Sequence, residues 1–207
     1  MNITVHAPIL AIAVPLLGAF ALPLFAKVHR NLRDLWGAAV AAFTAAMAIT
    51  LAVQVFTSGI QVYTLGAPTP THTVVPGGFP IRIMLVVDAL SAFMGLITTA
   101  VGLASLLYAW RFLREDQGKT LALTLFFLLW AGIYGLEYTG DMFNFFVFLE
   151  ITSVAACALI GYRTWESRPP EAAFKTMALY TLGGLLVLLA VGILYGCLLY
   201  TSPSPRD

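Results

Sequence analysis

The stretch TGDMFNFFVFLEITSVAACALIGYR, residues 139–163, decides the fold, because it is a mostly apolar run with one carboxylate, Glu150, in its middle. An α-helix rises 1.5 Å per residue, so about 20 such residues span a hydrocarbon layer of about 30 Å. Runs of this kind recur along the 207 residues, which are 60% hydrophobic and 10% charged, with a mean hydropathy of +0.89. Soluble domains do not have this composition. The sequence therefore predicts an all-α integral membrane protein.

We expect six transmembrane spans within a helical region covering residues 1–200. They are predicted at 7–26, 35–57, 83–110, 120–138, 142–162 and 172–200. The first run has no basic residue before it and no small-residue cleavage pattern after it, so we interpret it as a retained helix and not a signal peptide. The exterior loop, residues 58–82, has prolines and repeated Gly and Thr, which favour turns and a small hairpin.

The basic residues predict the orientation of the chain. The first, third and fifth loops and their edges hold Lys27, Arg30, Arg33, Arg111, Arg114, Lys119, Arg163 and Arg168, whereas the second and fourth loops hold only Arg82. Cytoplasmic loops carry an excess of Lys and Arg. This pattern predicts that the N-terminus lies outside, in a multi-pass protein of the cell inner (plasma) membrane.

Glu150 is the strongest candidate for a functional residue. It lies eight residues into the fifth predicted span, about 12 Å deep. An ionised carboxylate there costs at least about 2.5 kcal/mol, so Glu150 is expected to point into a helix bundle. Beside a movable positive charge, a buried Glu can bind and release a proton. The alternative is a static ion pair or hydrogen bond that holds helices together.

Lys175 lies about one turn into the sixth predicted span. At that depth a lysine can extend to the lipid headgroups, or it can be buried as a second proton-handling group. If the helices that carry Glu150 and Lys175 pack together, each side chain can tune the pKa of the other.

Three further carboxylates are candidates for either a structural role or a place on an ion path. Asp141, which follows Gly140, most simply caps the fifth span, and Glu137 is expected at the membrane interface. Asp88 lies near the outer start of the third span and fits a helix end or an ion path equally well.

The sequence predicts no cofactor and no metal site. Its two cysteines, Cys157 and Cys197, lie in separate apolar runs, and iron–sulfur and zinc sites need clustered ligands. It also has no phosphate-binding glycine loop, no nucleophile elbow and no basic aromatic surface for nucleic acid. We therefore expect no catalytic centre within this chain and no nucleic-acid partner.

Four segments together resemble a known family over about residues 79–196. They are FPIRIMLVVDALSAFMGLI, YTGDMFNFFVFLE, ALIGYR and EAAFKTMALYTLGGLLVLLAVGILYG. The chain resembles the proton-translocating, antiporter-like membrane subunits of respiratory complex I, a family that includes the large subunits of Mrp sodium/proton antiporters and of membrane-bound hydrogenases. The form TGDMFNFFVFLEITS is slightly more similar to the Mrp and hydrogenase branch.

The resemblance implies roles for two residues and a larger setting. Glu150 matches the fifth-helix glutamate that the family uses in ion transfer, and Lys175 matches a lysine near the cytoplasmic access path. Family members have about fourteen helices, so the six predicted here correspond to the front of a larger bundle. The ending CLLYTSPSPRD, residues 197–207, departs from the family pattern, and we predict a truncated or non-native tail.

The predicted function is translocation of H⁺, or of Na⁺ in exchange for H⁺, by a subunit that works in the lipid bilayer with other membrane subunits. Two alternatives stay open: a non-transporting anchor or assembly subunit of an oxidoreductase or hydrogenase, and a quinone-associated subunit of an NADH dehydrogenase. The sequence leaves open which complex the chain joins and which ion it carries.

Overall fold

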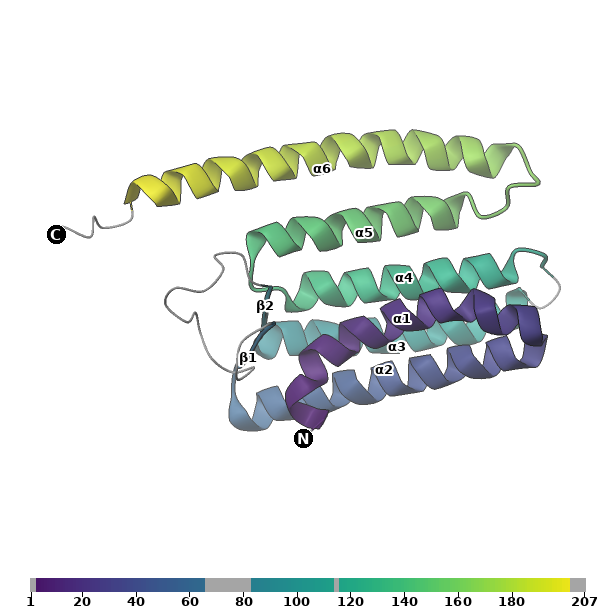
Figure 1. Cartoon of the computed structure of the whole chain (residues 1–207), viewed down its shortest axis with the longest axis horizontal. Helices are drawn as coiled ribbons and strands as arrows, with labels where there is room; N and C mark the ends of the chain where they lie inside the picture. Colours follow the sequence, from purple (N-terminus) through teal and green to yellow (C-terminus); the bar gives the residue numbers. More distant parts are fainter. Residues whose placement is uncertain (1–2, 66–82, 114–115, 202–207) are drawn as a thin grey trace.

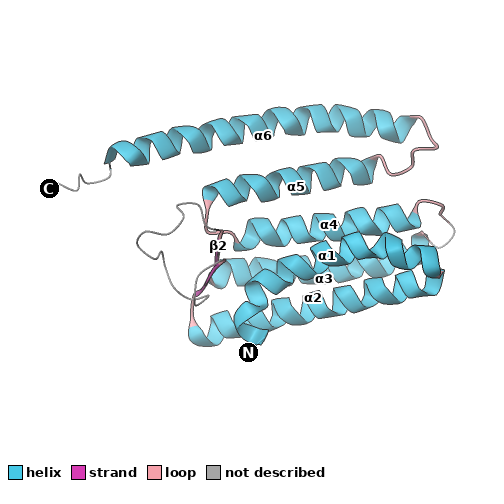
Figure 2. Cartoon of the chain, in the orientation of Figure 1, coloured by secondary structure: helices cyan, strands magenta, loops and turns pink. Residues whose placement is uncertain are grey.

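The chain forms six long helices that lie side by side, with a short hairpin at one end (Figures 1 and 2). The computed structural model describes residues 3–65, 83–113 and 116–201. The helices are η1 (Ile3–His6), α1 (Ala7–Val28), α2 (Arg30–Ser58), α3 (Ala89–Phe112), α4 (Lys119–Tyr138), α5 (Met142–Ile160) and α6 (Arg168–Thr201), and the strands are β1 (Gln61–Thr64) and β2 (Met84–Val87). Helices α1 to α6 are each long and apolar enough to cross a membrane. The prediction of an all-α membrane protein is confirmed.

Two helices begin earlier than predicted. The backbone of His29 is extended (φ −159°, ψ 140°) and its side chain accepts a hydrogen bond from the Asn31 amide, so α2 begins at Arg30 directly after α1. Helix α6 begins at Arg168, because prolines fit the first turn of a helix, where no N–H is needed. In both cases polar residues at the membrane edge extend the helix beyond its apolar run.

The third span was predicted from residue 83, and this start is wrong. Residues 84–87 form β2, which pairs antiparallel with β1 in a register that places Gln61 opposite Val87 and Thr64 opposite Met84. The apolar sequence MLVV fits a strand as well as a helix, so hydrophobicity alone could not separate them. The sequence predicted a hairpin within residues 58–82; β1 lies in that range, but β2 lies beyond it, in the segment predicted as helix. Residues 66–82, including THTVVPGG, His72 and Arg82, lie outside the described part.

Helix α4 is the centre of the bundle and packs against α1, α3 and α5 (Figure 1). Its aromatic side chains fill the core, where Phe127, Tyr134 and Tyr138 are almost completely buried. Helix α5 packs on α4 and α6 packs on α5, so α6 is the outermost helix of this row. The site described below lies between these outer helices.

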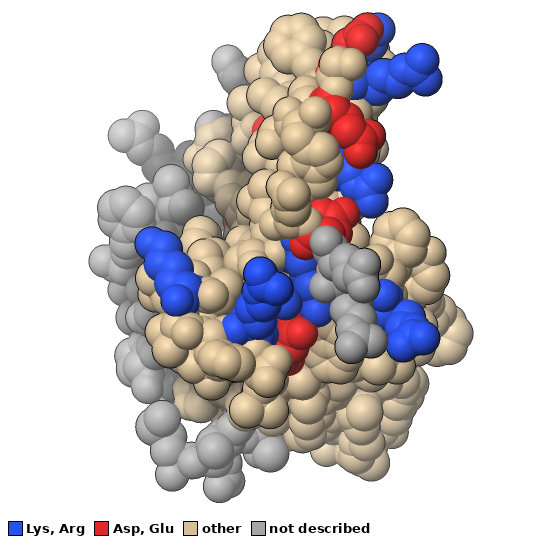
Figure 3. All heavy atoms as spheres, turned by 90° about the vertical axis from the view of Figure 1, so that its right-hand side faces the viewer, with Lys and Arg blue, Asp and Glu red and all other residues tan. Residues whose placement is uncertain are grey.

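The basic side chains gather at one end of the bundle, where the α1–α2, α3–α4 and α5–α6 connections meet (Figure 3). The described residues at this end are Lys27, Arg30, Arg33, Arg111, Lys119, Arg163 and Arg168. From this grouping the sequence predicts that this end faces the cytoplasm, and by that prediction it is called the inner end, while the end with the hairpin is called the outer or exterior end. Arg114 lies outside the described residues.

Candidate ion-translocation site

Glu150 lies on the face of α5 that is turned towards α6. Its carboxylate is packed against Gly184 so closely that a Cβ at that position would overlap Oε1. On the opposite face of α5, Phe148 lies against Gly135 and Thr152 lies against Gly132, both in α4. These contacts fix the rotation of α5 and hold Glu150 between α5 and α6.

The depth of Glu150 is close to the middle of its helix. It lies eight residues from Met142 and ten from Ile160, which correspond to about 12 Å and about 15 Å along the axis. Its side chain is half-buried and forms no hydrogen bond or ion pair with any described residue.

The structure does not place Lys175 close to Glu150. It lies nine residues before Gly184, which corresponds to about 13 Å along α6 and about half a turn around it. Its ammonium group pairs instead with Glu171, one turn earlier, at 2.5 Å, and its side chain is 72% exposed. This exposure fits a lysine that extends towards the headgroups at the inner end of the bundle.

Asp141 caps α5, as predicted. Its carboxylate accepts hydrogen bonds from the backbone amides of Phe143 at 3.3 Å and Asn144 at 3.2 Å. The buried side chain of Asn144 donates to Thr139 Oγ1 at 3.0 Å, and the Gly140 amide donates to the Met84 carbonyl of β2 at 2.9 Å. The cap therefore also ties the start of α5 to the exterior hairpin. A place for Asp141 on an ion path stays a prediction.

Asp88 caps α3 in the same way. Its Oδ1 accepts a hydrogen bond from the Ser91 backbone amide at 2.7 Å. This bond holds the pKa of the Asp88 carboxyl below its usual value. The structural interpretation of Asp88 is thus sufficient to account for its position.

Glu137 lies near the outer end of α4 but is turned towards α3. Thr98 Oγ1 donates a hydrogen bond to its Oε1 at 2.5 Å, while its Oε2 is buried without a hydrogen-bond partner among the described residues. One turn deeper, the Thr99 and Tyr134 hydroxyl groups are 2.7 Å apart and buried. Glu137 therefore faces a helix–helix contact, and its place at the membrane interface stays a prediction.

Comparison with known proteins decides the family. Residues 74–121 match the family described as NADH-ubiquinone oxidoreductase (complex I), chain 5 N-terminus, and residues 139–201 match the family described as NADH:quinone oxidoreductase/Mrp antiporter, TM. The chain belongs to this family of antiporter-like membrane subunits.

Individual relatives agree with this assignment. NADH-quinone oxidoreductase subunit N of Desulforudis audaxviator is 34% identical over 197 residues, which cover 93% of this chain and 37% of that protein. A subunit of the Na(+)/H(+) antiporter of Alkalihalophilus pseudofirmus is 31% identical over 118 residues, or 56% of this chain and 23% of that protein. A chain from the structure of the membrane-bound sulfane sulfur reductase, an archaeal respiratory membrane complex, superimposes with a TM-score of 0.76 at 28% identity, covering 92% of this chain and 37% of that one.

The two matched segments include most of the candidate residues, but not all of them. This antiporter-like chain spans between about a quarter and about two fifths of the length of these relatives. Asp88 lies in the first matched segment, and Asp141, Glu150 and Lys175 lie in the second. Glu137 lies between the two segments, so the family match says nothing about it.

Sequence reasoning missed an ion-pair cluster at the inner end of this antiporter-like bundle. Asp34, in the first turns of α2, pairs with Arg33 at 2.8 Å and with Lys119, at the start of α4, at 2.9 Å. Arg33 also donates to Thr120 Oγ1 at 3.0 Å. Arg33 and Lys119 are buried, although their place in basic loops suggested solvated cations. The lone Asp34 among those cations was the available signal.

Proposed function

We propose that this antiporter-like subunit takes part in moving H⁺, or Na⁺ in exchange for H⁺, across the membrane, and that Glu150 carries the proton. The observation that supports this most strongly is the position of Glu150 near the middle of the apolar helix α5, facing Gly184 and without an ionic partner among the described residues. The relatives named as a quinone oxidoreductase subunit and as part of an Na(+)/H(+) antiporter support the same class of function.

Glu150 works by changing between a neutral and a charged form. The neutral acid is tolerated between apolar helices, whereas the carboxylate needs water or a cation nearby. Gly184 has no side chain, so the Glu150 carboxylate can lie directly against the α6 backbone, where a Cβ would overlap Oε1. The half-buried carboxylate is therefore held at the α5–α6 contact, where water or a cationic side chain has to come close for it to ionise.

Lys175 serves the inner end of this path. It lies about 13 Å from the level of Glu150 along α6 and is exposed where α6 begins. A positive charge there attracts anions and repels cations at the inner surface, so it influences the loading of the path without contacting Glu150. Transfer between the two positions then requires water or further side chains.

The subunit is proposed to work with other membrane subunits in the inner (plasma) membrane. Only 6% of the most apolar part of α6 is buried, compared with 44% for α4, so α6 presents an apolar surface for lipid or for a neighbouring subunit. Redox centres, where the complex has them, are then expected in the partners and not in this chain.

The α6 glycine pair offers a matched test of this function. Gly184→Val places a side chain against the Glu150 carboxylate, whereas Gly183→Val, one residue away, meets open space. Within the assembled complex in sealed vesicles, proton flux per complex should fall several-fold for Gly184→Val and change little for Gly183→Val. Equal fluxes for the two variants would show that the space in front of Glu150 has no part in transport.

A further inference from the structure

A second carboxylate of the membrane region, Glu137, lies on the opposite side of α4 from α5. One oxygen, Oε1, accepts the hydrogen bond from Thr98, and the other, Oε2, is buried with no partner in the described part of the chain. Among the described residues, no basic side chain forms an ion pair with Glu137. A buried polar atom without a partner is rare in proteins and calls for an explanation.

Neither obvious structural explanation accounts for Glu137. A helix cap would place the carboxylate on backbone amides, but Glu137 lies at the carboxyl end of α4, where backbone carbonyls and the negative end of the helix dipole lie. A structural ion pair would need a cation, and none of the described basic side chains supplies one. One hydroxyl donor does not compensate for burying a full negative charge.

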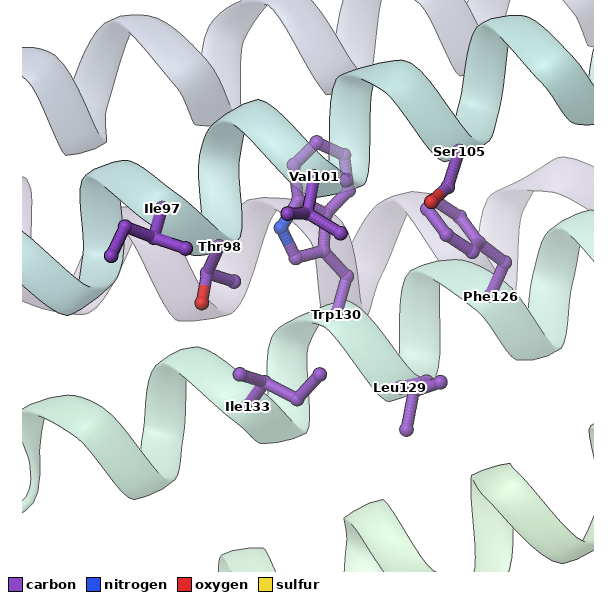
Figure 4. A pocket seen from close by; sticks show the side chains of 9 residues that line it. Ile97, Thr98, Val101, Ser105, Phe126, Leu129, Trp130 and Ile133 are labelled. Atoms are coloured by element: carbon purple, nitrogen blue, oxygen red, sulfur yellow. The ribbon is translucent and has the colours of Figure 1, made fainter.

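A cavity of about 280 Å³ lies between α3 and α4, next to this carboxylate (Figure 4). Thr98, the hydrogen-bond donor to Glu137, lines the cavity, and Ser105 adds a second hydroxyl group to a wall that is otherwise mostly apolar. Trp130 also lines the cavity, and its Nε1 is buried without a hydrogen-bond partner among the described residues. A water molecule occupies about 30 Å³, so the cavity has room for water beside the two hydroxyl groups.

We propose that Glu137, held by Thr98 beside the α3–α4 cavity, is a second proton-binding site that exchanges its proton with cavity water through the Thr98 hydroxyl. In the charged state Oε1 takes the hydroxyl proton of Thr98 while Thr98 Oγ1 takes a proton from a hydronium ion in the cavity, which leaves a neutral carboxyl, an intact hydroxyl and a water molecule. The reverse steps return the proton to cavity water. This site is separate from Glu150, because the contact between α4 and α5 lies between them.

Infrared spectroscopy of the full chain in lipid bilayers tests the site. The carboxylic-acid carbonyl band is recorded across a pH series for the wild type and for Glu137→Gln, an uncharged variant of nearly the same shape. One titrating component should disappear in Glu137→Gln and remain in Glu171→Gln, which removes an exposed carboxylate. Unchanged spectra, or a Glu137 component that never titrates, would overturn the proposal.

The hydrogen bond with Thr98 offers a second readout that a different carboxyl group would not give. Thr98→Val should shift the frequency of the Glu137 component, because a carbonyl stretch depends on hydrogen bonding. Thr124→Val is the matched control, since its hydroxyl bonds to the Thr120 carbonyl of its own helix. A shift in both variants or in neither would argue against a Thr98-bound Glu137.

Thiol reactivity tests whether the cavity holds water. In a background with Cys157→Ala and Cys197→Ala, the variant Ser105→Cys puts a thiol in the cavity, and Thr44→Cys puts one at a fully buried position of α2. A small water-soluble thiol reagent should modify the first and spare the second. Reaction of Ser105→Cys with a lipid-soluble reagent alone would mean that acyl chains fill the cavity, which contradicts the proposal.

The proposal and the role of Glu150 can fail separately. Glu150→Gln should leave the Glu137 component of the infrared band in place, whatever it does to transport. If Glu137→Gln keeps normal spectra while Glu150→Gln abolishes transport, only the second site is wrong. If the Glu137 component titrates while Glu150→Gln transports normally, only the proposed function is wrong.

Discussion

Carboxylates at or near the outer half of this bundle fall into two kinds by their hydrogen bonds. Asp88 and Asp141 stand at helix starts, where backbone amides bind the charge. Glu137 and Glu150 lie within helices, where no amide is free, and neither has an ionic partner among the described residues. Residue type alone does not separate these pairs, but helix position does, and both of our proposals place proton exchange on the second pair.

The cap on α3 predicts a local effect of Asp88→Ala. Losing such a cap costs about 1 kcal/mol, so amide exchange in the first turn of α3 should become roughly fivefold faster near neutral pH. Hydrogen–deuterium exchange with mass spectrometry can follow this segment. Asp88→Asn, which keeps an acceptor oxygen but loses the charge, should exchange at a rate between those of the wild type and Asp88→Ala.

The same cap predicts a pH dependence. The pKa of Asp88 is lowered because the Ser91 amide stabilises the charged form. The stabilisation is therefore present above the usual aspartate pKa of 3.8 and is lost as the pH falls below it, through the lowered pKa. The difference in exchange between the wild type and Asp88→Ala should shrink in strong acid, and a constant difference would contradict a charge-dependent cap.

At the scale of elements, close contacts at glycines set how the helices face one another. Gly132 and Gly135 let α5 lie directly on α4, and Gly184 does the same for α6 on α5. Because Phe148 and Glu150 are two residues apart, they point to opposite faces of α5. Seating Phe148 on α4 therefore turns Glu150 towards α6.

This arrangement predicts that Gly135→Leu disturbs more than its own position. The added side chain would overlap the ring of Phe148, and overpacking of this kind costs roughly 1–3 kcal/mol. The thermal unfolding midpoint of the purified chain in detergent should fall. Gly192→Leu, in open space on α6, should change it little, and a similar loss for both variants would mean that the α4–α5 contact is not special.

The spans could be predicted from the sequence because each is a continuous apolar run, and helix formation in a membrane depends mainly on such runs. Residues 84–87 were misassigned because their pairing with β1 is a long-range contact. Likewise, the depth of Glu150 followed from counting residues, but its face, and the separation of Lys175 from it, depend on which residues pack between helices. The setting of Glu137 depends on Thr98, 39 residues earlier.

For the whole molecule, polar contacts tie the helices together at both ends. The Asp34 cluster joins α2 to α4 at the inner end, and at the outer end β2 joins the start of α5 through the Gly140–Met84 hydrogen bond. Between these ends the core is apolar and aromatic. In the two proposals above, the groups that change charge are Glu137 and Glu150, which lie on either side of the α4–α5 contact.

The most direct measurement of the role of Glu150 is proton flux per assembled complex in sealed vesicles, with the amount of complex measured in the same sample. Glu150→Gln should assemble normally and lose most of the flux, because the amide keeps the shape of the side chain but cannot carry a proton, while Glu166→Gln, at a half-exposed carboxylate of the α5–α6 connection, should keep the flux. Normal flux per complex with fewer complexes would contradict proton carriage by Glu150 and would make it an anchor between helices.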